Sequence, residues 1–434
     1  MKIKFKRVFF PFLLGGLVFC SSLKEAQSFQ IKVSEETFAD MYAQIRVFYL
    51  NRDKDKDHNY KWNDFQIYKF RLAIKGQINP LVQFYGMLDA NENEGYQAKL
   101  WEAGVQFTFA PEFVVKVGEL RVPFSRHNFV ARHDSVVMSS DGNYFLPSQF
   151  KDALRAVDPY VGGYRKDQPF KRTDFGTVIA GSIKDGLFKY YLGIFNNDRF
   201  PGNKVWRLTG GFGNATASPK DKKNFEYDLR LEFTPTFWGF KSEETVFDPS
   251  LRVRQTYLGK RDTMTFGLGY HHEKHLEGLN PATYKTSSLT RKAWAADFFV
   301  EKTFGKYIPG LELGYMYFDD THLYQATPTT YKKGDAYTWY VDAHLIYKEK
   351  IGFGIPGIGF RYEYVNVDGN FQNKKDLAYD RYGVCFTYYL HGAATKLGIG
   401  FDTVKAKDAL KAYIKNRKWE DSTTTWYVGL YAQF

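Results

Sequence analysis

The sequence contains only two cysteines among its 434 residues, Cys20 and Cys385. Cys20 lies in an apolar segment near the N-terminus, and removal of that segment would leave Cys385 alone. A lone cysteine excludes an internal disulfide. The absence of CxxC and CxxCH excludes the usual thiol-pair, zinc-ribbon and attached-haem sites. We therefore expect no cofactor.

Long hydrophobic runs are also missing. After residue 28 no segment approaches the ~18 apolar residues that a membrane-spanning helix needs. Charged residues make up 25% of the chain and the mean hydropathy is −0.44, yet 18% of the residues are aromatic. This combination predicts a chain that is apolar at alternate residues only. Each strand would then have one polar face in contact with water and one apolar face.

Residues 1–28 have the composition of a signal peptide. A basic start, MKIKFKR, precedes the apolar stretch VFFPFLLGGLVF, and Ala26-Gln27-Ser28 forms a small-x-small cleavage pattern. We expect cleavage after Ser28, which leaves residues 29–434 as one domain. An uncleaved membrane anchor is the alternative, but the apolar core is short for one. The pattern therefore predicts export.

In the rest of the chain, polar and apolar residues alternate with a period of two, which is typical of strands. In FEYDLRLEFTP, apolar residues on one face oppose charged ones on the other, namely Phe225, Tyr227, Leu229, Leu231 and Phe233 against Glu226, Asp228, Arg230 and Glu232. The last residues, TTWYVGLYAQF, alternate in the same way up to Phe434. Sixteen such strands are predicted at 37–50, 62–78, 81–90, 100–109, 112–121, 173–185, 187–196, 225–235, 263–273, 292–304, 310–319, 337–349, 356–367, 380–390, 394–405 and 423–434. The linker 236–262 could hold two more, which would make eighteen.

The connections between these strands alternate between short and long. Tight turns such as NP (79–80) and KDG (184–186) alternate along the chain with long polar loops. This pattern predicts an all-β, antiparallel transmembrane β-barrel with short periplasmic turns and long extracellular loops, in the outer membrane of a Gram-negative-type bacterium. A soluble β-sandwich would also alternate by twos, but it gives no reason for loop length to alternate.

A closed barrel also explains why the chain ends in a strand. Lipid offers no partner to an open sheet edge, so the last strand must pair with the first. Phe434 would lie in the aromatic girdle at the periplasmic interface. A C-terminal aromatic strand of this kind also resembles the signal read by the outer-membrane assembly machinery.

One connection, residues 123–172, is far longer than the ~15 residues beyond which loops are uncommon. It is the third long loop, and we expect it to fold into the lumen and narrow it. A sixteen-stranded barrel is too wide for side chains to fill, so the default function is passive diffusion of small hydrophilic solutes through a water-filled channel.

Basic residues in this loop and on the lumen wall predict a preference for anions, because low-dielectric walls focus their field. The loop candidates are Arg126, His127, Arg132, His133, Lys151 and Arg155, and the wall candidates are Arg46, Lys69, Arg71, Lys75 and Lys116. The alternative is a non-selective channel. Residues that face the lumen must be polar in any case, and the same alternation places many acidic residues on that inward face. Basic residues on outer loops could instead bind outer-membrane lipid.

Two segments resemble the phosphate-selective porin O and P family. VKVGELRVPFS (115–125) is similar to the strand and Pro-Phe passage that opens the constriction loop of that family. TDFGTVIAGSIKDGLFKYYLGIFNN (173–197) resembles its next hairpin, and GIGFRYEYVN (357–366) and LGIGFDTVK (397–405) are looser matches. The resemblance implies a sixteen-stranded homotrimer with a basic eyelet formed by the third loop, and phosphate-like or other small anions as solutes.

Other function classes find less support. An outer-membrane barrel enzyme needs a Ser–His or Asp–His pair, and no nucleophile stands out. His271, His272 and His275 in HHEKH could bind a metal, but a solvated loop explains them as well, so we expect no metal site. About eight residues before the first strand are too few for a transporter plug. The basic residues do not gather on one face, so no nucleic-acid partner is expected.

Overall fold

The structure is a computed structural model in which most of the mature chain is described. The described residues are 29–55, 61–91, 98–140, 145–147, 149–150, 173–196, 204–205, 213–214, 225–279, 286–327, 330–371 and 374–434. The predicted signal peptide lies outside them. No helix within these residues is long and apolar enough to cross a membrane.

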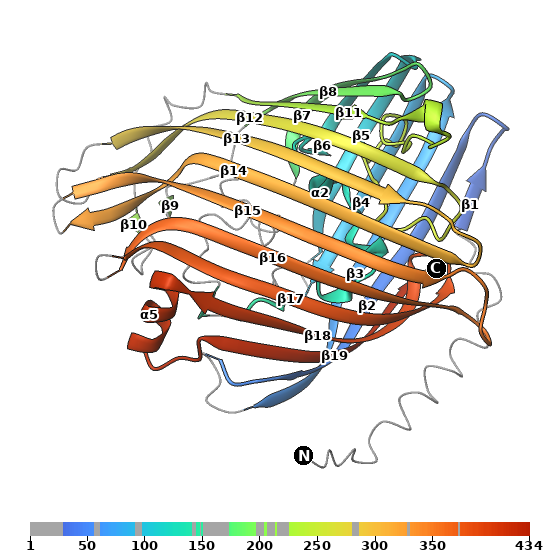
Figure 1. Cartoon of the computed structure of the whole chain (residues 1–434). Helices are drawn as coiled ribbons and strands as arrows, with labels where there is room; N and C mark the ends of the chain where they lie inside the picture. Colours follow the sequence, from blue (N-terminus) through green and yellow to red (C-terminus); the bar gives the residue numbers. More distant parts are fainter. Residues whose placement is uncertain are drawn as a thin grey trace.

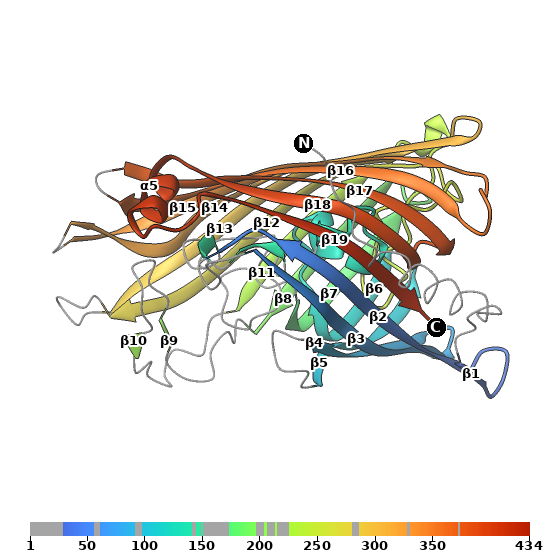
Figure 2. The same cartoon turned by 90° about the horizontal axis from the view of Figure 1, so that it is seen from below.

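Sixteen antiparallel strands close into a barrel (Figures 1 and 2). They are β2 (Phe38–Arg52), β3 (Trp62–Asn79), β4 (Val82–Asn91), β5 (Lys99–Ala110), β6 (Phe113–Arg121), β7 (Thr173–Ile183), β8 (Phe188–Phe195), β11 (Glu226–Phe233), β12 (Thr263–Leu279), β13 (Thr286–Glu301), β14 (Tyr307–Thr327), β15 (Thr330–Tyr347), β16 (Ile355–Phe371), β17 (Lys374–His391), β18 (Thr395–Lys407) and β19 (Ser422–Gln433). A short extra strand, β1 (Phe29–Lys32), pairs with the start of β2. Two-residue strands β9 (Lys204–Val205) and β10 (Gly213–Asn214) pair with each other.

The sixteen predicted strands are confirmed, and each overlaps one strand of the barrel. The linker 236–262 adds no further barrel strand. It begins instead with the short 3₁₀ helix η5 (Thr236–Trp238). The eighteen-stranded alternative is therefore wrong, because β8, β11 and β12 already pair side by side in continuous register.

Two features at the long-loop end differ from the prediction. The hairpins β12–β13, β14–β15 and β16–β17 continue into segments that the pattern predicts as loops. β14 has 21 residues, whereas about 9–11 suffice to cross a bilayer, so paired backbone extends beyond the membrane. The polar connection after β18 contains helix α5 (Asp408–Asn416), whose Leu410 and Ile414 are buried.

The alternation along each strand separates an outer and an inner face. Leu268, Phe386 and Trp426 are at least half exposed and point outward, as a lipid-facing surface requires. On β3 the register shifts between the pairs Arg46–Lys69 and Val47–Ile67. This bulge turns both Tyr68 and Lys69 inward, where each is 1% exposed.

The two ends of the barrel differ. Tight turns gather at the end where the C-terminus lies, and α5 lies at the opposite end with β9 and β10 (Figure 1). In the β7–β8 turn, Lys184, Asp185 and Gly186 all have positive φ, which matches a tight hairpin turn. The expected closure is present, because Phe434 and Ala43 exchange two backbone hydrogen bonds of 2.6 and 3.0 Å.

Closure can be tested by a disulfide across the β19–β2 seam. Gln44 and Gln433 are register partners, and their side chains are joined by a 2.8 Å hydrogen bond. In a Cys385→Ser background we expect Gln44→Cys with Gln433→Cys to cross-link nearly completely under mild oxidation. The unfolded, oxidised chain should then migrate faster on a non-reducing gel. Gln44→Cys with Leu430→Cys places the thiols on opposite faces and should not cross-link. Equal cross-linking of both pairs would contradict the register.

Candidate functional site

Two segments enter the lumen of the barrel. The first, called here the inner loop, is the described part of the long connection after β6, residues 122–140, 145–147 and 149–150. The second, the inner connection, is residues 240–262 between β11 and β12. They run side by side where Val253 donates a backbone hydrogen bond to Phe129 (3.0 Å) and accepts one from Ala131 (2.9 Å). For the described part of the third loop the expected inward fold is confirmed, and a second segment joins it there.

Buried ion pairs fix the start of the inner loop. Arg126 lies in the four-residue helix α2 (Arg126–Phe129), which Ser125 caps through its side chain. Its guanidinium is 2.8 Å from Glu243 Oε1 of the inner connection and 2.6 Å from Glu312 Oε2 of β14. All three side chains are at most 1% exposed. Arg126 therefore anchors the loop, and its charge is already balanced by two carboxylates.

A second set of ion pairs continues this anchor along the wall. Asp297 on β13 accepts a hydrogen bond from the backbone N–H of Arg126 (2.9 Å). The same carboxylate pairs with Arg230 on β11 (2.7 Å), which also contacts Glu232 (2.8 Å). Lys189 on β8 pairs with Glu232 at 2.7 Å. The acids on this part of the lumen wall are thus paired with cations in a buried network.

The later part of the inner loop reaches the other side of the lumen. Lys396 on β18 donates to the carbonyl of His133 (2.9 Å), and Thr387 on β17 donates to that of Val136 (2.9 Å). Tyr431 on β19 donates to the carbonyl of Met138 (3.0 Å). The loop therefore spans the lumen from β11–β14 to β17–β19, and its position is set by contacts at both sides.

Basic side chains gather between the inner segments and the wall formed by β2, β3, β6 and β18. This group, the basic strip, consists of Arg46, Lys69, Arg71, Arg121, Arg252, Arg254 and Lys396. Three acids lie among them, namely Asp89, Glu102 and Asp134. Among the described residues, seven basic side chains therefore stand against three carboxylates along this side of the lumen.

Several contacts hold the strip in shape. Arg46 donates through Nε to His133 Nδ1 (3.0 Å), and Arg71 pairs with Asp89. Arg252 of the inner connection donates to the hydroxyl of Tyr42 (3.0 Å) and also contacts Glu102 (3.2 Å).

The side chain of Arg254 is 56% exposed and lies 3.9 Å from Asp134. It is thus a guanidinium presented to solvent on a segment held by buried contacts.

Burial is the main influence on protonation in the inner segments, and the basic strip modifies it. Burial, together with Arg46, Lys396 and Arg71, holds the pKa of His133 well below its usual value. Burial also lowers the pKa of Arg252, and Arg71 and Arg46 add to that effect. The pKa of Asp134 is raised by burial, although Arg254 and other cations of the strip oppose the rise. His133 is therefore neutral near pH 7, and its Nδ1 can accept the Arg46 hydrogen bond.

The other predicted site residues fall in different places. Lys116 is buried and donates to Gln106 and to the backbone carbonyl of Asp248. Lys75 is exposed near the short-turn end of β3. His127 packs against the ring of Tyr340 at 5.7 Å. The side chains of Arg132, Lys151 and Arg155 lie outside the described residues, so their predicted role remains a prediction.

The sequence reading missed the inner connection and its two arginines. A signal was available, since residues 234–262 form a long connection at the end where the other turns are short. Within RVRQ (252–255), Arg252 and Arg254 alternate with the buried Val253. Such alternation in an extended segment places both arginines on the face opposite the side chain of Val253.

Comparisons with known proteins agree with this architecture. The sequence model of the family "Phosphate-selective porin O and P" matches residues 40–137. The match confirms the family resemblance. That segment runs from β2 to the inner loop and carries Arg46, Lys69, Arg71 and Arg121 of the strip. An uncharacterized protein of Aquifex aeolicus is 23% identical over 208 residues, which is 48% of this chain and only 42% of that protein.

Solved structures show the same fold at low identity. OprB of Pseudomonas putida is 10% identical, with a TM-score of 0.53, over 91% of this chain and 94% of the other. The anion-selective porin from Comamonas acidovorans is 10% identical, with a TM-score of 0.51, over 92% of this chain and 100% of the other. The fold of this chain is therefore that of a sixteen-stranded porin barrel.

The anchor role of Arg126 predicts a loss of stability on its removal. Arg126→Met should leave Glu243 and Glu312 buried without a cation, at a cost of about 3–5 kcal/mol. We expect a lower thermal unfolding midpoint and faster proteolysis of the inner loop in detergent. The matched variant Arg126→Met with Glu243→Gln and Glu312→Gln removes the unpaired charges and should recover most of the loss. An unfolding midpoint of Arg126→Met equal to that of the unmodified protein would contradict the anchor.

Proposed function

We propose that this chain forms an outer-membrane channel through which small hydrophilic solutes diffuse passively, with a preference for anions. The observation that supports this most directly is the basic strip, in which the solvent-exposed Arg254 lies among six further basic side chains. The barrel supplies a low-dielectric wall around these charges, which strengthens their field at the constriction. A phosphate, a carboxylate or a halide entering the lumen would meet this field.

Aromatic rings help to hold the cations of the strip in place, with Arg252 over Tyr85 at 4.6 Å and Arg46 over Tyr431 at 5.0 Å. Such stacking fixes the orientation of a guanidinium plane. Conduction needs sites of moderate affinity, and the exposed Arg254 would supply one of them.

Three acids of the lumen wall near the start of the inner loop do not cancel this preference. Glu232, Asp297 and Glu312 are each paired with Arg126, Arg230 or Lys189 in the buried network, so little of their field reaches solvent. A non-selective channel is the competing proposal, and it would require the two charge signs to be balanced along the solute path. The excess of cations over acids in the strip favours the anion channel.

We also propose the assembly that the resemblance implies. The chain would be exported through its N-terminal signal, inserted by the outer-membrane assembly machinery through the Phe434 strand, and assembled as a homotrimer in outer-membrane lipid. The porin from Comamonas acidovorans is described as anion-selective, which supports the proposed preference. A channel, rather than an enzyme, is the function that the barrel and the basic strip favour.

Charge reversal at the exposed arginine tests the proposal. We expect Arg254→Glu to lower the chloride-to-potassium permeability ratio by roughly threefold or more, because it inverts the charge closest to solvent in the strip. The ratio is measured from the reversal potential in planar bilayers under a KCl gradient. The control is Lys350→Glu, which makes the same charge change on an exposed turn outside the lumen. A cation-selective unmodified channel, or an equal effect of the control, would overturn the proposal.

The neutral state of His133 gives a pH prediction. Because its pKa in the folded protein lies below the unfolded value, the unfolded chain takes up this proton first as pH falls below about 6.5. Acidification from pH 7 to pH 5 should therefore destabilise the protein, and His133→Gln should reduce that loss of thermal stability. Anion selectivity should be the same in both proteins between pH 8 and pH 6. A pH-dependent selectivity that His133→Gln abolishes would show that His133 is charged.

A further inference from the structure

Four buried ionisable side chains form a cluster on β11 and β12. Glu226 and Asp228 alternate on the inward face of β11, and His271 and Glu273 do so on β12. Asp228 is the register partner of His271, and Glu226 is that of Glu273. Each of the four is at most 4% exposed. In the barrel order β11 lies three strand positions from β6, the nearest wall strand of the basic strip, and the two groups share no residue.

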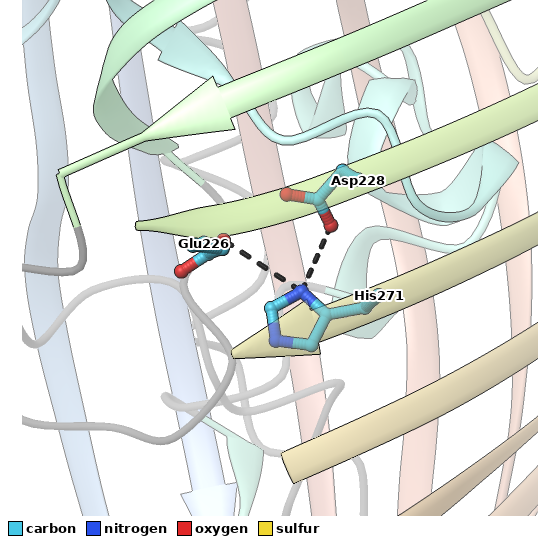
Figure 3. Close-up of side chains that lie close together, drawn as sticks. All are labelled: Glu226, Asp228 and His271. Atoms are coloured by element: carbon cyan, nitrogen blue, oxygen red, sulfur yellow. Dashed lines mark hydrogen bonds and ion pairs between the residues drawn. The ribbon is translucent and has the colours of Figure 1, made fainter. Parts of the chain in front are cut away.

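The geometry is that of a metal-ligand set (Figure 3). His271 Nδ1 points to both carboxylates of β11, at 2.8 Å from Asp228 Oδ1 and 3.7 Å from Glu226 Oε1. The three ligand atoms all lie within 4.8 Å of one another. A tetrahedral ion bound at 2.0–2.1 Å places its ligand atoms roughly 3.3 Å apart, so small side-chain adjustments would suffice.

The opposite edge of the imidazole is also arranged as in metal sites. His271 Nε2 lies 3.9 Å from Glu273 Oε2, and the other oxygen of Glu273 is held by Arg291 at 2.9 Å. A histidine that binds a metal through one nitrogen commonly directs the other to a carboxylate, which fixes the ring and raises its basicity. Glu273 lies on that side of the ring and would have to approach by roughly 1 Å to accept this hydrogen bond.

The cluster brings three acidic side chains together. Among the described residues, Arg291 places one permanent positive charge beside Glu273. Glu226 and Glu273 face each other directly across the strands. Like charges at such positions are destabilising, and a bound cation would relieve that repulsion. Within the described part of the chain, Asp228 Oδ2 has no hydrogen-bond partner.

We propose that Glu226, Asp228 and His271 bind one divalent transition-metal ion of the zinc class. Imidazole with carboxylates suits zinc, nickel or iron, whereas calcium and magnesium prefer oxygen ligands alone. The ion would join β11 to β12 and balance the buried acids. His271 also packs against the ring of Phe124 at 6.2 Å, so the ion would stabilise the wall where the inner loop begins. This site is independent of the proposed anion selectivity.

Metal titration of the whole protein tests the site. The folded barrel is purified in detergent, stripped with EDTA, and titrated with ZnCl₂ by calorimetry and with CoCl₂ by visible absorption. We expect one zinc ion per chain, a higher thermal unfolding midpoint with zinc, and no competition from a large excess of Mg²⁺. His271→Gln and Asp228→Asn should each weaken zinc binding by at least about tenfold.

The neighbouring histidine provides the matched control. His272 points to the outer face beside Tyr227, so His272→Gln should bind zinc as the unmodified protein does. Heat-modifiable gel mobility establishes that each variant is folded, and Glu226→Gln serves as a second ligand variant if one of the others is not. The proposal is overturned if the unmodified protein binds no zinc at equimolar concentration. It is also overturned if folded His271→Gln with Asp228→Asn binds zinc as tightly as the unmodified protein.

Discussion

The backbone pairing of β19 with β2 is the contact on which the remaining structure depends. In lipid an unpaired strand edge would leave a row of N–H and C=O groups without partners, at several kcal/mol each. Nine register pairs, from Thr425–Arg52 to Gln433–Gln44, remove that edge. Closure at sixteen strands then sets the radius of the barrel, and a barrel of that radius leaves a lumen that wall side chains cannot fill. The inner loop and the inner connection occupy part of that lumen.

The inner loop and the inner connection lie inside the barrel, and buried ion pairs hold them in specific positions. Arg126 contacts the inner connection through Glu243 and the wall through Glu312, so one guanidinium ties three parts of the chain together. Buried ion pairs add little net stability compared with apolar packing, but they are costly to break. Buried ion pairs are therefore suited to fixing the position of a segment, because any displacement of it would leave buried charges without partners.

Local alternation predicts the fold well and the site only in part. The face of each strand can be read from the sequence, and Glu226, Asp228, Arg230 and Glu232 all point inward as the pattern predicts. The bulge at Lys69 and the pairing of Arg126 could not be read in this way. Both depend on which residues lie opposite in space, and the long connections between strands hide that register. The partners of His271 were missed for the same reason, because β11 and β12 are separated by the inner connection.

Burial explains how a lumen with many acids could carry the proposed preference for anions. A count of charges from the sequence does not distinguish a paired acid such as Glu312 from an exposed cation such as Arg254. In the structure Glu312 is paired and 1% exposed at its side chain, whereas the Arg254 side chain is 56% exposed. A compensated pair in a buried network has a short-ranged field, while an exposed cation beside a low-dielectric wall acts over the width of the constriction. The proposed selectivity would therefore depend on which charges the inner segments cover and which they leave facing solvent, more than on the sum of charges on the wall.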